Sequence, residues 1–302
     1  MEQFSHAELA LEESKKLLAL EDFENAVSIY NEILINHGDF VRARLNNVEA
    51  LQMHKELLKC HIVLDLIKQK KIDNGFFINL GHYPLLDRPS PNIFIGPKTI
   101  NAINQYKGPC KSIQNLARGV LTKVIGRPET TTLIYCAHSV PSDLIDMCRI
   151  SGFVPMKNVL DIGAGAGVQA IGLSLLQPQI EFIQLFEQHD FMKESIIEIF
   201  KLNQFENYSL NVPMKTPIDF IYSFRACGYI FSVDTYYDYI QKFKTSNSFS
   251  LIDVGSPQNT DYECSRLIEL YKEARVMYHY GQIPMQYSRV LAGEIEGKPW
   301  RD

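Results

Sequence analysis

A run of small residues after Asp161 has the composition of a turn that lets a ligand approach the backbone. The run reads Ile162-Gly163-Ala164-Gly165-Ala166-Gly167, and the apolar pair Val159-Leu160 precedes the aspartate. Glycine adopts positive φ angles at little cost and has no Cβ that would collide with a ligand. A helix that begins after such a turn presents backbone N–H groups at its N-terminus. We therefore expect a buried strand, a glycine turn and a helix that together bind a ligand.

The spacing of the glycines separates two classes of nucleotide cofactor. A dinucleotide fingerprint G-x-G-x-x-G that began at Gly163 would need Gly or Ala at the position of Val168, so a nicotinamide-dependent oxidoreductase is disfavoured. The acid-x-G-x-G-x-G order that begins at Asp161 resembles instead the first motif of class I S-adenosylmethionine-dependent methyltransferases. The resemblance implies a methyltransferase with S-adenosylmethionine as its cofactor. The residues that it places at the cofactor are Asp161, Gly163, Ala164, Gly165 and Gly167.

The next apolar run ends at Glu187, which Gln188 follows. In the same family, an acid at the end of the second strand hydrogen-bonds both ribose hydroxyls of the cofactor. A carboxylate suits that role because it accepts two hydrogen bonds and donates none, which matches a vicinal diol. The resemblance therefore adds Glu187 and Gln188 to the expected cofactor-binding residues.

A second resemblance covers the run from Asp219 to Arg225. The run reads Asp219-Phe220-Ile221-Tyr222-Ser223-Phe224-Arg225 and is similar to a D-x-(I/V)-Y-S-F-R stretch of a sugar O-methyltransferase group. The fourth strand of this fold ends at the transferable methyl, so the resemblance makes the last four of these residues candidates to line the acceptor pocket. It implies that a sugar hydroxyl of a saccharide or glycoconjugate receives the methyl group. A small metabolite or a protein stays open as the acceptor, and so does a catalytically silent domain that binds a partner.

Methyl transfer needs little from the protein beyond alignment, because the sulfonium of the cofactor is already an activated leaving group. A sugar hydroxyl has a high pKa and therefore needs a general base. The candidates are His138, His189, Asp190 and His279. The expected catalytic set is His138, His189 and Arg225. The sequence has no cluster of carboxylates that would assist the reaction with a metal, so we expect none.

These residues need a scaffold that brings strand ends together. After Pro141 the sequence predicts strands over 158–162, 181–187, 218–224 and 249–254, and helices over 142–151, 168–176, 190–203, 233–244 and 261–274. Strands that alternate with crossover helices form a parallel, doubly wound sheet. Two β-rich runs, 276–280 and 287–292, resemble the antiparallel hairpin that closes a methyltransferase sheet. The predicted fold class is α/β, with a Rossmann-like sheet and a C-terminal hairpin.

The first part of the chain has a different pattern. From 7 to 69, apolar residues recur at helical spacing, and Ala26 and Tyr30 meet the A-x-x-x-F spacing of a tetratricopeptide repeat. A Pro-rich stretch follows, with helices predicted over 98–106 and 111–125, and it holds basic but no acidic residues from 88 to 128. This stretch is either a solvated face or a wall that receives an anionic acceptor. We predict a tetratricopeptide-like helical module at 1–70, a basic connector at 71–140 and a methyltransferase domain at 141–302.

The composition bears on the class of the protein, its partners and its location. Its 302 residues are 46% hydrophobic and 22% charged, as in an ordinary globular protein. A net charge of −5 gives no field that would gather nucleic acid. No stretch of the sequence approaches the roughly 18 apolar residues that a membrane span needs. The six cysteines form no C-x-x-C pair. We expect a cytoplasmic protein with a small-molecule or glycan acceptor and a protein partner, or a second copy, at its N-terminal helices. We expect neither a nucleic-acid partner nor a membrane span.

Overall fold

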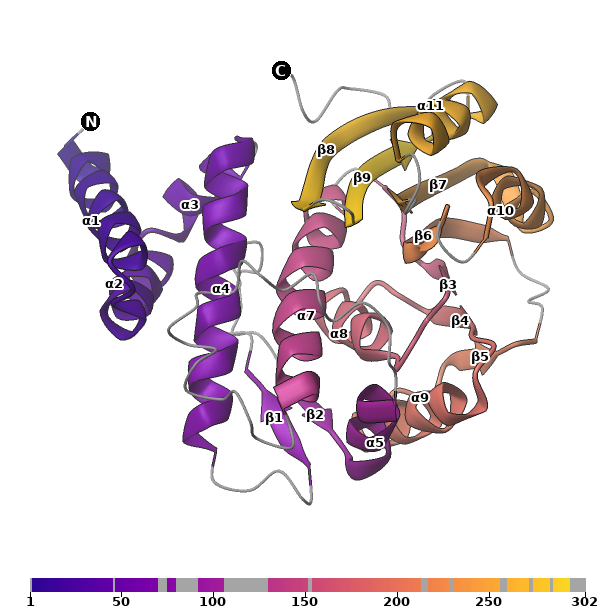
Figure 1. Cartoon of the computed structure of the whole chain (residues 1–302), viewed down its shortest axis with the longest axis horizontal. Helices are drawn as coiled ribbons and strands as arrows, with labels where there is room; N and C mark the ends of the chain where they lie inside the picture. The colour runs from indigo at the N-terminus through magenta and orange to yellow at the C-terminus, as the bar shows by residue number, and fades with distance from the viewer. Residues whose placement is uncertain are drawn as a thin grey trace. The chain divides into compact units, whose positions relative to one another are not determined.

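The computed structural model divides the chain into two compact units, Met1–Asp146 and Met147–Asp302. It describes residues 2–45, 47–69, 75–79, 92–105, 130–151, 154–212, 217–228, 231–255, 260–271, 274–282 and 285–293. Figure 1 labels the helices and strands of both units. The three-part division at 70 and 140 stays a prediction.

The first unit begins with helices, as the apolar spacing predicts. They are α1 (Glu2–Ala19), α2 (Phe23–Asn36), α3 (Gly38–Arg44) and α4 (Val48–Lys68). Ala26 and Tyr30 are buried, and the Ser14 hydroxyl donates to the Ala26 carbonyl at 2.8 Å, which joins α1 to α2. The Asn47 side chain caps α4 by accepting a hydrogen bond from the Ala50 N–H. The helical pattern is confirmed, whereas the likeness to a tetratricopeptide repeat stays a prediction.

The predicted connector contains regular structure beyond the expected helices. β1 (Phe76–Ile78) pairs antiparallel with β2 (Ile93–Ile95), and the sequence analysis did not predict this hairpin. The first expected helix is confirmed as α5 (Pro97–Gln105). The second expected helix, over 111–125, lies outside the described residues, as do the basic residues Arg88, Lys107, Lys111, Arg118, Lys123 and Arg127.

The helix expected to begin at residue 142 is corrected to a longer one. α7 runs from Thr130 to Ile150 and therefore continues through Pro141. A proline inside a helix removes one hydrogen bond and costs about 3 kcal/mol. Cys136, Ala137, Leu144 and Ile145 are all buried at helical spacing, which offsets that cost. Pro141 predicted a helix boundary because the sequence alone does not show this burial.

The second unit is an α/β fold around one seven-stranded sheet (Figure 1). Its strands are β3 (Asn158–Ile162), β4 (Phe182–Phe186), β5 (Tyr208–Leu210), β6 (Ile218–Cys227), β7 (Lys244–Gly255), β8 (Ala274–Gln282) and β9 (Met285–Ala292). Its helices, besides the end of α7, are α8 (Val168–Leu176), α9 (Asp190–Leu202), α10 (Val233–Ile240) and α11 (Thr260–Leu270). The strand order is β5-β4-β3-β6-β7-β9-β8, and β9 runs antiparallel to both of its neighbours. The predicted Rossmann-like fold with a C-terminal antiparallel hairpin is confirmed.

The sheet reverses its direction of growth between β3 and β6. The chain adds β4 and then β5 on one side of β3 and crosses to β6 on the other side. In open parallel sheets, ligands bind outside the carboxyl ends of the strands at such a switch point. Val159 and Leu160 in β3 are completely buried, so this strand lies in the core and holds its carboxyl end firmly.

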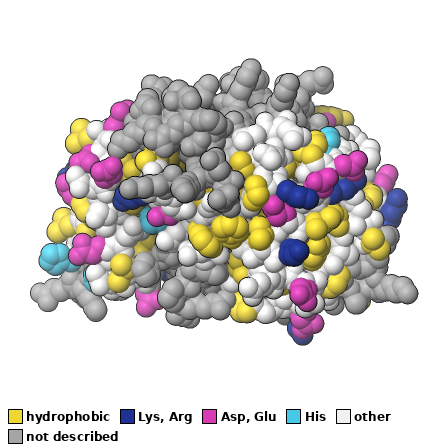
Figure 2. All heavy atoms as spheres, turned by 90° about the horizontal axis from the view of Figure 1, so that it is seen from below, with side chains coloured by type: hydrophobic (Ala, Val, Ile, Leu, Met, Phe, Trp, Pro, Cys, Tyr) yellow, Lys and Arg dark blue, Asp and Glu magenta, His cyan; other side chains and the backbone are white. Residues whose placement is uncertain are grey.

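The surface carries charges of both signs. On the face drawn in Figure 2, acidic and basic side chains of the described residues are interspersed. Five cysteines, Cys60, Cys136, Cys148, Cys227 and Cys264, are buried free thiols. None of the helices in the described part of the chain is long and apolar enough to span a bilayer.

Candidate functional site

The glycine turn has the conformation that its sequence predicts. Gly163, Gly165 and Gly167 all have positive φ angles, of 81°, 55° and 79°. The N–H groups of Gly163 and Ala164 both donate to the Phe186 carbonyl, at 2.9 and 3.0 Å, and thereby tie the turn to the end of β4. α8 begins directly after the turn, with Gly167 at its N-cap. The turn therefore lies at the carboxyl edge of the sheet, where backbone N–H groups can meet a ligand.

Close packing on two sides crowds the positions of Gly163 and Gly167 in the turn. A Cβ at Gly163 would lie 3.1 Å from the Ala226 Cβ, near the end of β6. A Cβ at Gly167 would lie 3.1 Å from Ile196 Cγ1 and 3.2 Å from Ile199 Cγ2, both in α9. The turn is thus held between the end of β6 and helix α9.

Glu187 reaches back to the glycine turn. Its Oε2 accepts a hydrogen bond from the Gly165 N–H at 2.8 Å, and its Oε1 accepts from the N–H groups of Gln188 and His189 at 2.8 and 2.9 Å. The side chain is buried, with 9% of its surface exposed. A carboxylate has about four acceptor positions, so it keeps acceptor capacity beyond these three bonds. The structure thus brings together the acid and the glycine turn that the sequence analysis assigned to one cofactor.

Asn211 supports Glu187 from the next strand, and the sequence analysis did not identify it. Its Oδ1 accepts from the Glu187 N–H at 2.9 Å, and its Nδ2 donates to the Glu187 carbonyl at 2.7 Å. Its φ is 56°, a left-handed conformation that asparagine tolerates better than most residues. An asparagine directly after a short strand is the only sequence signal for this support.

Asp161 is fixed by a tyrosine of the neighbouring strand. The Tyr222 hydroxyl donates to Asp161 Oδ2 at 2.8 Å, and the two residues are register partners across β3 and β6. Both are buried, with 3% and 1% of their surfaces exposed. The next hydroxyl, of Ser223, donates to the Ile162 carbonyl at 2.9 Å. Of the four predicted acceptor-pocket residues, Tyr222 and Ser223 therefore bind the end of β3.

Arg225 lies in an irregular part of β6. The pairing register of β6 with β7 shifts between Ser223 and Cys227, and Arg225 has a φ of 62°. A left-handed conformation at a residue other than glycine is strained, and such strain is concentrated at functional sites. Arg225 is half-buried, whereas Phe224 before it is buried. Arg225 and Glu187 thus lie at the same edge of the sheet, on opposite sides of β3.

The candidate general bases are less well placed. His189 is exposed, and its ring stacks on Phe191 with the centroids 5.4 Å apart. Asp190 accepts a hydrogen bond from Lys193 that lowers the pKa of the carboxyl group, which makes it a weaker base. His138 belongs to the first unit, in α7, and His279 to β8, but both side chains lie outside the described ones.

In the part of the chain that the structure describes, no group of three or more His, Cys, Asp or Glu side chains could hold a metal ion.

No family model matches the chain, and no curated protein matches it in sequence. Solved structures are similar to about half of it. One is a precorrin-6y C5,15-methyltransferase from Geobacter metallireducens, with 14% identity over 50% of this chain and 88% of that chain and a TM-score of 0.38. A ribosomal protein L11 methylase from Lactobacillus delbrueckii subsp. bulgaricus has 13% identity over 52% and 80%, with a TM-score of 0.41. A SAM-dependent methyltransferase from Aquifex aeolicus has 14% identity over 49% and 88%, with a TM-score of 0.39. At this distance the site has to be interpreted from its own geometry.

Proposed function

We propose that the second unit binds S-adenosylmethionine and transfers its methyl group to an acceptor oxygen. The observation that carries this proposal is the 2.8 Å hydrogen bond from the Gly165 N–H to Glu187 Oε2. It joins the acid-x-G-x-G-x-G turn to the acid after the next strand, which are two separate parts of one cofactor signature. Their meeting at the switch point of the sheet is the arrangement that a nucleotide cofactor requires.

Each group of residues at the carboxyl edge of the sheet has its own role in binding the proposed cofactor. The glycine turn and the N-terminus of α8 let the ligand approach the backbone, with Ala164 between the first two glycines. Asp161 receives the methionine part, and Glu187 and Gln188 receive the ribose hydroxyls. Carboxyl groups suit a ligand with a sulfonium and an ammonium group, because opposite charges attract. The cofactor supplies an activated methyl group, and the chain binds and orients it.

Arg225 is the residue best placed to meet the acceptor. It is half-buried at the carboxyl end of β6, whereas Tyr222, Ser223 and Phe224 before it are buried. The guanidinium can donate several hydrogen bonds to hydroxyl or anionic oxygens of a glycan, which supports a sugar hydroxyl as the acceptor. His189, two residues after Glu187, is proposed as the general base, and His138 stays a predicted catalytic residue. A small metabolite or a protein remains the alternative acceptor if screening finds no sugar acceptor.

The first unit is proposed to bind a protein partner or a second copy of the chain in the cytoplasm. Leu9, Leu20, Ile35 and Val48 belong to its helical region and expose 70, 77, 59 and 52% of their surfaces. Large exposed apolar side chains are candidates for interaction sites. Changing Leu9 and Leu20 to Asp should abolish any self-association seen by light scattering, and an unchanged mass would exclude these side chains from it.

Calorimetric titration with S-adenosylmethionine, S-adenosylhomocysteine and NADH tests the proposed cofactor. We expect micromolar binding of the first two and none of NADH. Glu187→Gln should weaken S-adenosylhomocysteine binding about tenfold or more, because a neutral amide replaces an acceptor-only carboxylate. Glu181→Gln is the matched control: this glutamate precedes the same strand, is exposed and pairs with Lys157 at 3.1 Å. Equal losses in both variants, or no binding by the unaltered protein, would contradict the proposal.

A further inference from the structure

A buried ion pair joins the C-terminal hairpin to β7. Arg289 in β9 and Asp253 in β7 are antiparallel register partners, and neither has any exposed surface. Arg289 Nε lies 2.5 Å from Asp253 Oδ1, and Nη2 lies 2.9 Å from Oδ2. The pair is therefore bidentate, which fixes the plane of the guanidinium group.

The guanidinium also contacts the irregular end of β6. Its central carbon lies 4.3 Å from the centroid of the Phe224 ring, within the range of a cation–π contact. The Phe224 ring in turn lies 5.3 Å from the Tyr222 ring. These two aromatic residues are two positions apart in a strand and so face the same side of the sheet. The Tyr222 hydroxyl donates to Asp161, which completes a series of contacts from β9 to β3.

Stability alone does not explain why the chain keeps this series. Burying an arginine and an aspartate costs free energy that their attraction returns only in part, and apolar residues often do as well in such a place. The series ends at a carboxylate of the proposed cofactor site, and it passes Phe224, the residue directly before the strained Arg225. Beyond its packing, the ion pair fixes the orientation of the Arg289 guanidinium group.

On the basis of the proposed function, we infer that Arg289 is a positioning residue for the cofactor. It holds the Phe224 and Tyr222 rings, so that the Tyr222 hydroxyl keeps the Asp161 carboxylate turned toward the methionine part of the ligand. A substitution of Arg289 should therefore weaken only the binding of the methionine part. The ribose is assigned to Glu187, which follows another strand.

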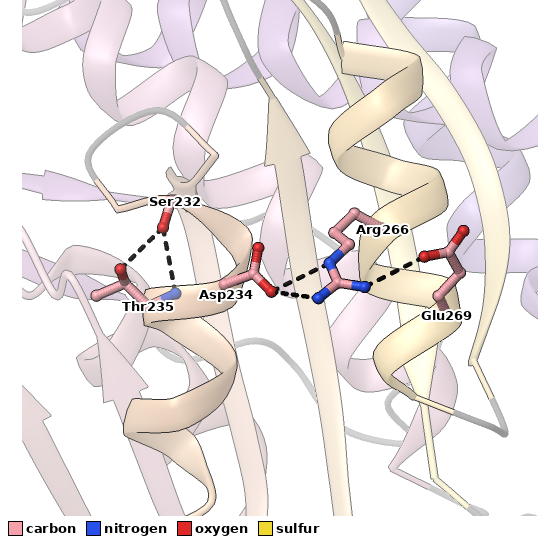
Figure 3. Close-up of polar contacts among 5 residues, drawn as sticks. All are labelled: Ser232, Asp234, Thr235, Arg266 and Glu269. Atoms are coloured by element: carbon pink, nitrogen blue, oxygen red, sulfur yellow. Dashed lines mark hydrogen bonds and ion pairs between the residues drawn. The ribbon is translucent and has the colours of Figure 1, made fainter.

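The second unit contains a matched control for Arg289. Arg266 of α11 also contacts an aspartate through two nitrogens. Its Nε and Nη2 lie 3.0 and 2.7 Å from one oxygen, Asp234 Oδ1, and its Nη1 lies 3.3 Å from Glu269 Oε2 (Figure 3). This second pair is exposed and links α10 to α11. Exposed pairs contribute little to stability. Arg266→Lys therefore makes the same chemical change away from the site.

Calorimetry with two ligands separates positioning from general loss of structure. S-adenosylhomocysteine has the amino-acid part, and methylthioadenosine lacks it. Arg289→Lys should weaken S-adenosylhomocysteine binding about tenfold and leave methylthioadenosine binding within about twofold, which corresponds to one hydrogen bond to a charged group. Arg266→Lys should change neither affinity. Equal weakening of both ligands by Arg289→Lys, or no weakening, would overturn the inference.

Tyr222→Phe keeps the inference testable if Arg289→Lys does not fold, because it removes only one hydroxyl. It should reproduce the selective loss of S-adenosylhomocysteine affinity. Where both variants fold, the double variant should bind that ligand no more than about twofold more weakly than Arg289→Lys alone, since two changes in one series of contacts are not additive. Additive losses would overturn the inference and leave the proposed function in place. An unaltered protein that binds neither ligand would overturn both.

Discussion

Acid should weaken the first unit through His54, a side chain of α4 with 1% of its surface exposed. Neither ring nitrogen makes a hydrogen bond to a described residue, and the ring packs against Tyr30 with the centroids 5.3 Å apart. Burial, and then the charge of Lys55, lower the pKa of His54 from 6.5 to about 3. The folded unit therefore keeps this imidazole neutral at pH values where an exposed histidine takes up a proton.

The size of this loss of stability follows from the coupling between proton binding at His54 and folding. Between pH 6.5 and about 3, the unfolded chain binds a proton at His54 that the folded chain does not, so stability falls as the pH falls through this window. At pH 5 the solution lies about 1.5 pH units below the unfolded pKa, and each unit corresponds to about 1.4 kcal/mol. The free energy of unfolding should therefore be about 2 kcal/mol lower at pH 5 than at pH 7.

Amide hydrogen exchange of α4 at both pH values, corrected for intrinsic rates, measures this loss in the first unit. His54→Phe keeps an aromatic ring beside Tyr30 but cannot take up a proton. The wild-type protein should lose about 2 kcal/mol more than this variant between pH 7 and 5, and the other histidines cancel in the comparison. If the two proteins lose the same amount, the buried neutral imidazole has been assigned wrongly.

Two more predictions concern the edge of the sheet in the second unit. Gly167→Ala should lower the opening free energy of α8 by about 1–2 kcal/mol, because an L-residue there is strained and its Cβ would lie 3.1 Å from Ile196. Gly38→Ala in the first turn of α3, where a Cβ meets no atom within 4 Å, should be neutral or stabilising, and a similar loss there would refute the explanation. Asn211→Gly keeps the left-handed backbone but removes both hydrogen bonds to the Glu187 backbone, so calorimetry should show S-adenosylhomocysteine binding about tenfold weaker. Unchanged binding would mean that Glu187 needs no support from β5.

The contact between the glycine turn and Glu187 could be predicted because it follows from the parallel sheet itself. The two segments each follow a short apolar run, and the carboxyl ends of neighbouring parallel strands meet at one edge. The sequence analysis assigned both segments to one cofactor through the resemblance to methyltransferase motifs, and the parallel pairing of β3 with β4 explains why they meet. Arg225 was assigned to the end of the fourth strand by the second resemblance. The structure places it on the other side of β3, because β6 is the first strand after the crossover.

The ion pair between Asp253 and Arg289 could not be predicted in the same way. The sequence shows one charged residue inside each of two apolar runs, but a run does not specify its partner strand or its register. The antiparallel register of β7 and β9 brings these two residues opposite each other. β1 and β2 were missed for a related reason, since three-residue strands are too short to show a period.

Several features that oppose folding lie at one edge of the second unit. Asp161 puts a carboxylate, 3% exposed, into a strand of apolar residues, where an apolar side chain would avoid the cost of desolvation. The turn after it uses three positive φ angles, and Arg225 adopts a fourth without being glycine. A sequence under pressure only to fold would avoid each of these features, and such conflicts between local preference and structure mark functional sites. Because they meet at the switch point of the sheet, a ligand-binding domain explains them better than a silent scaffold does.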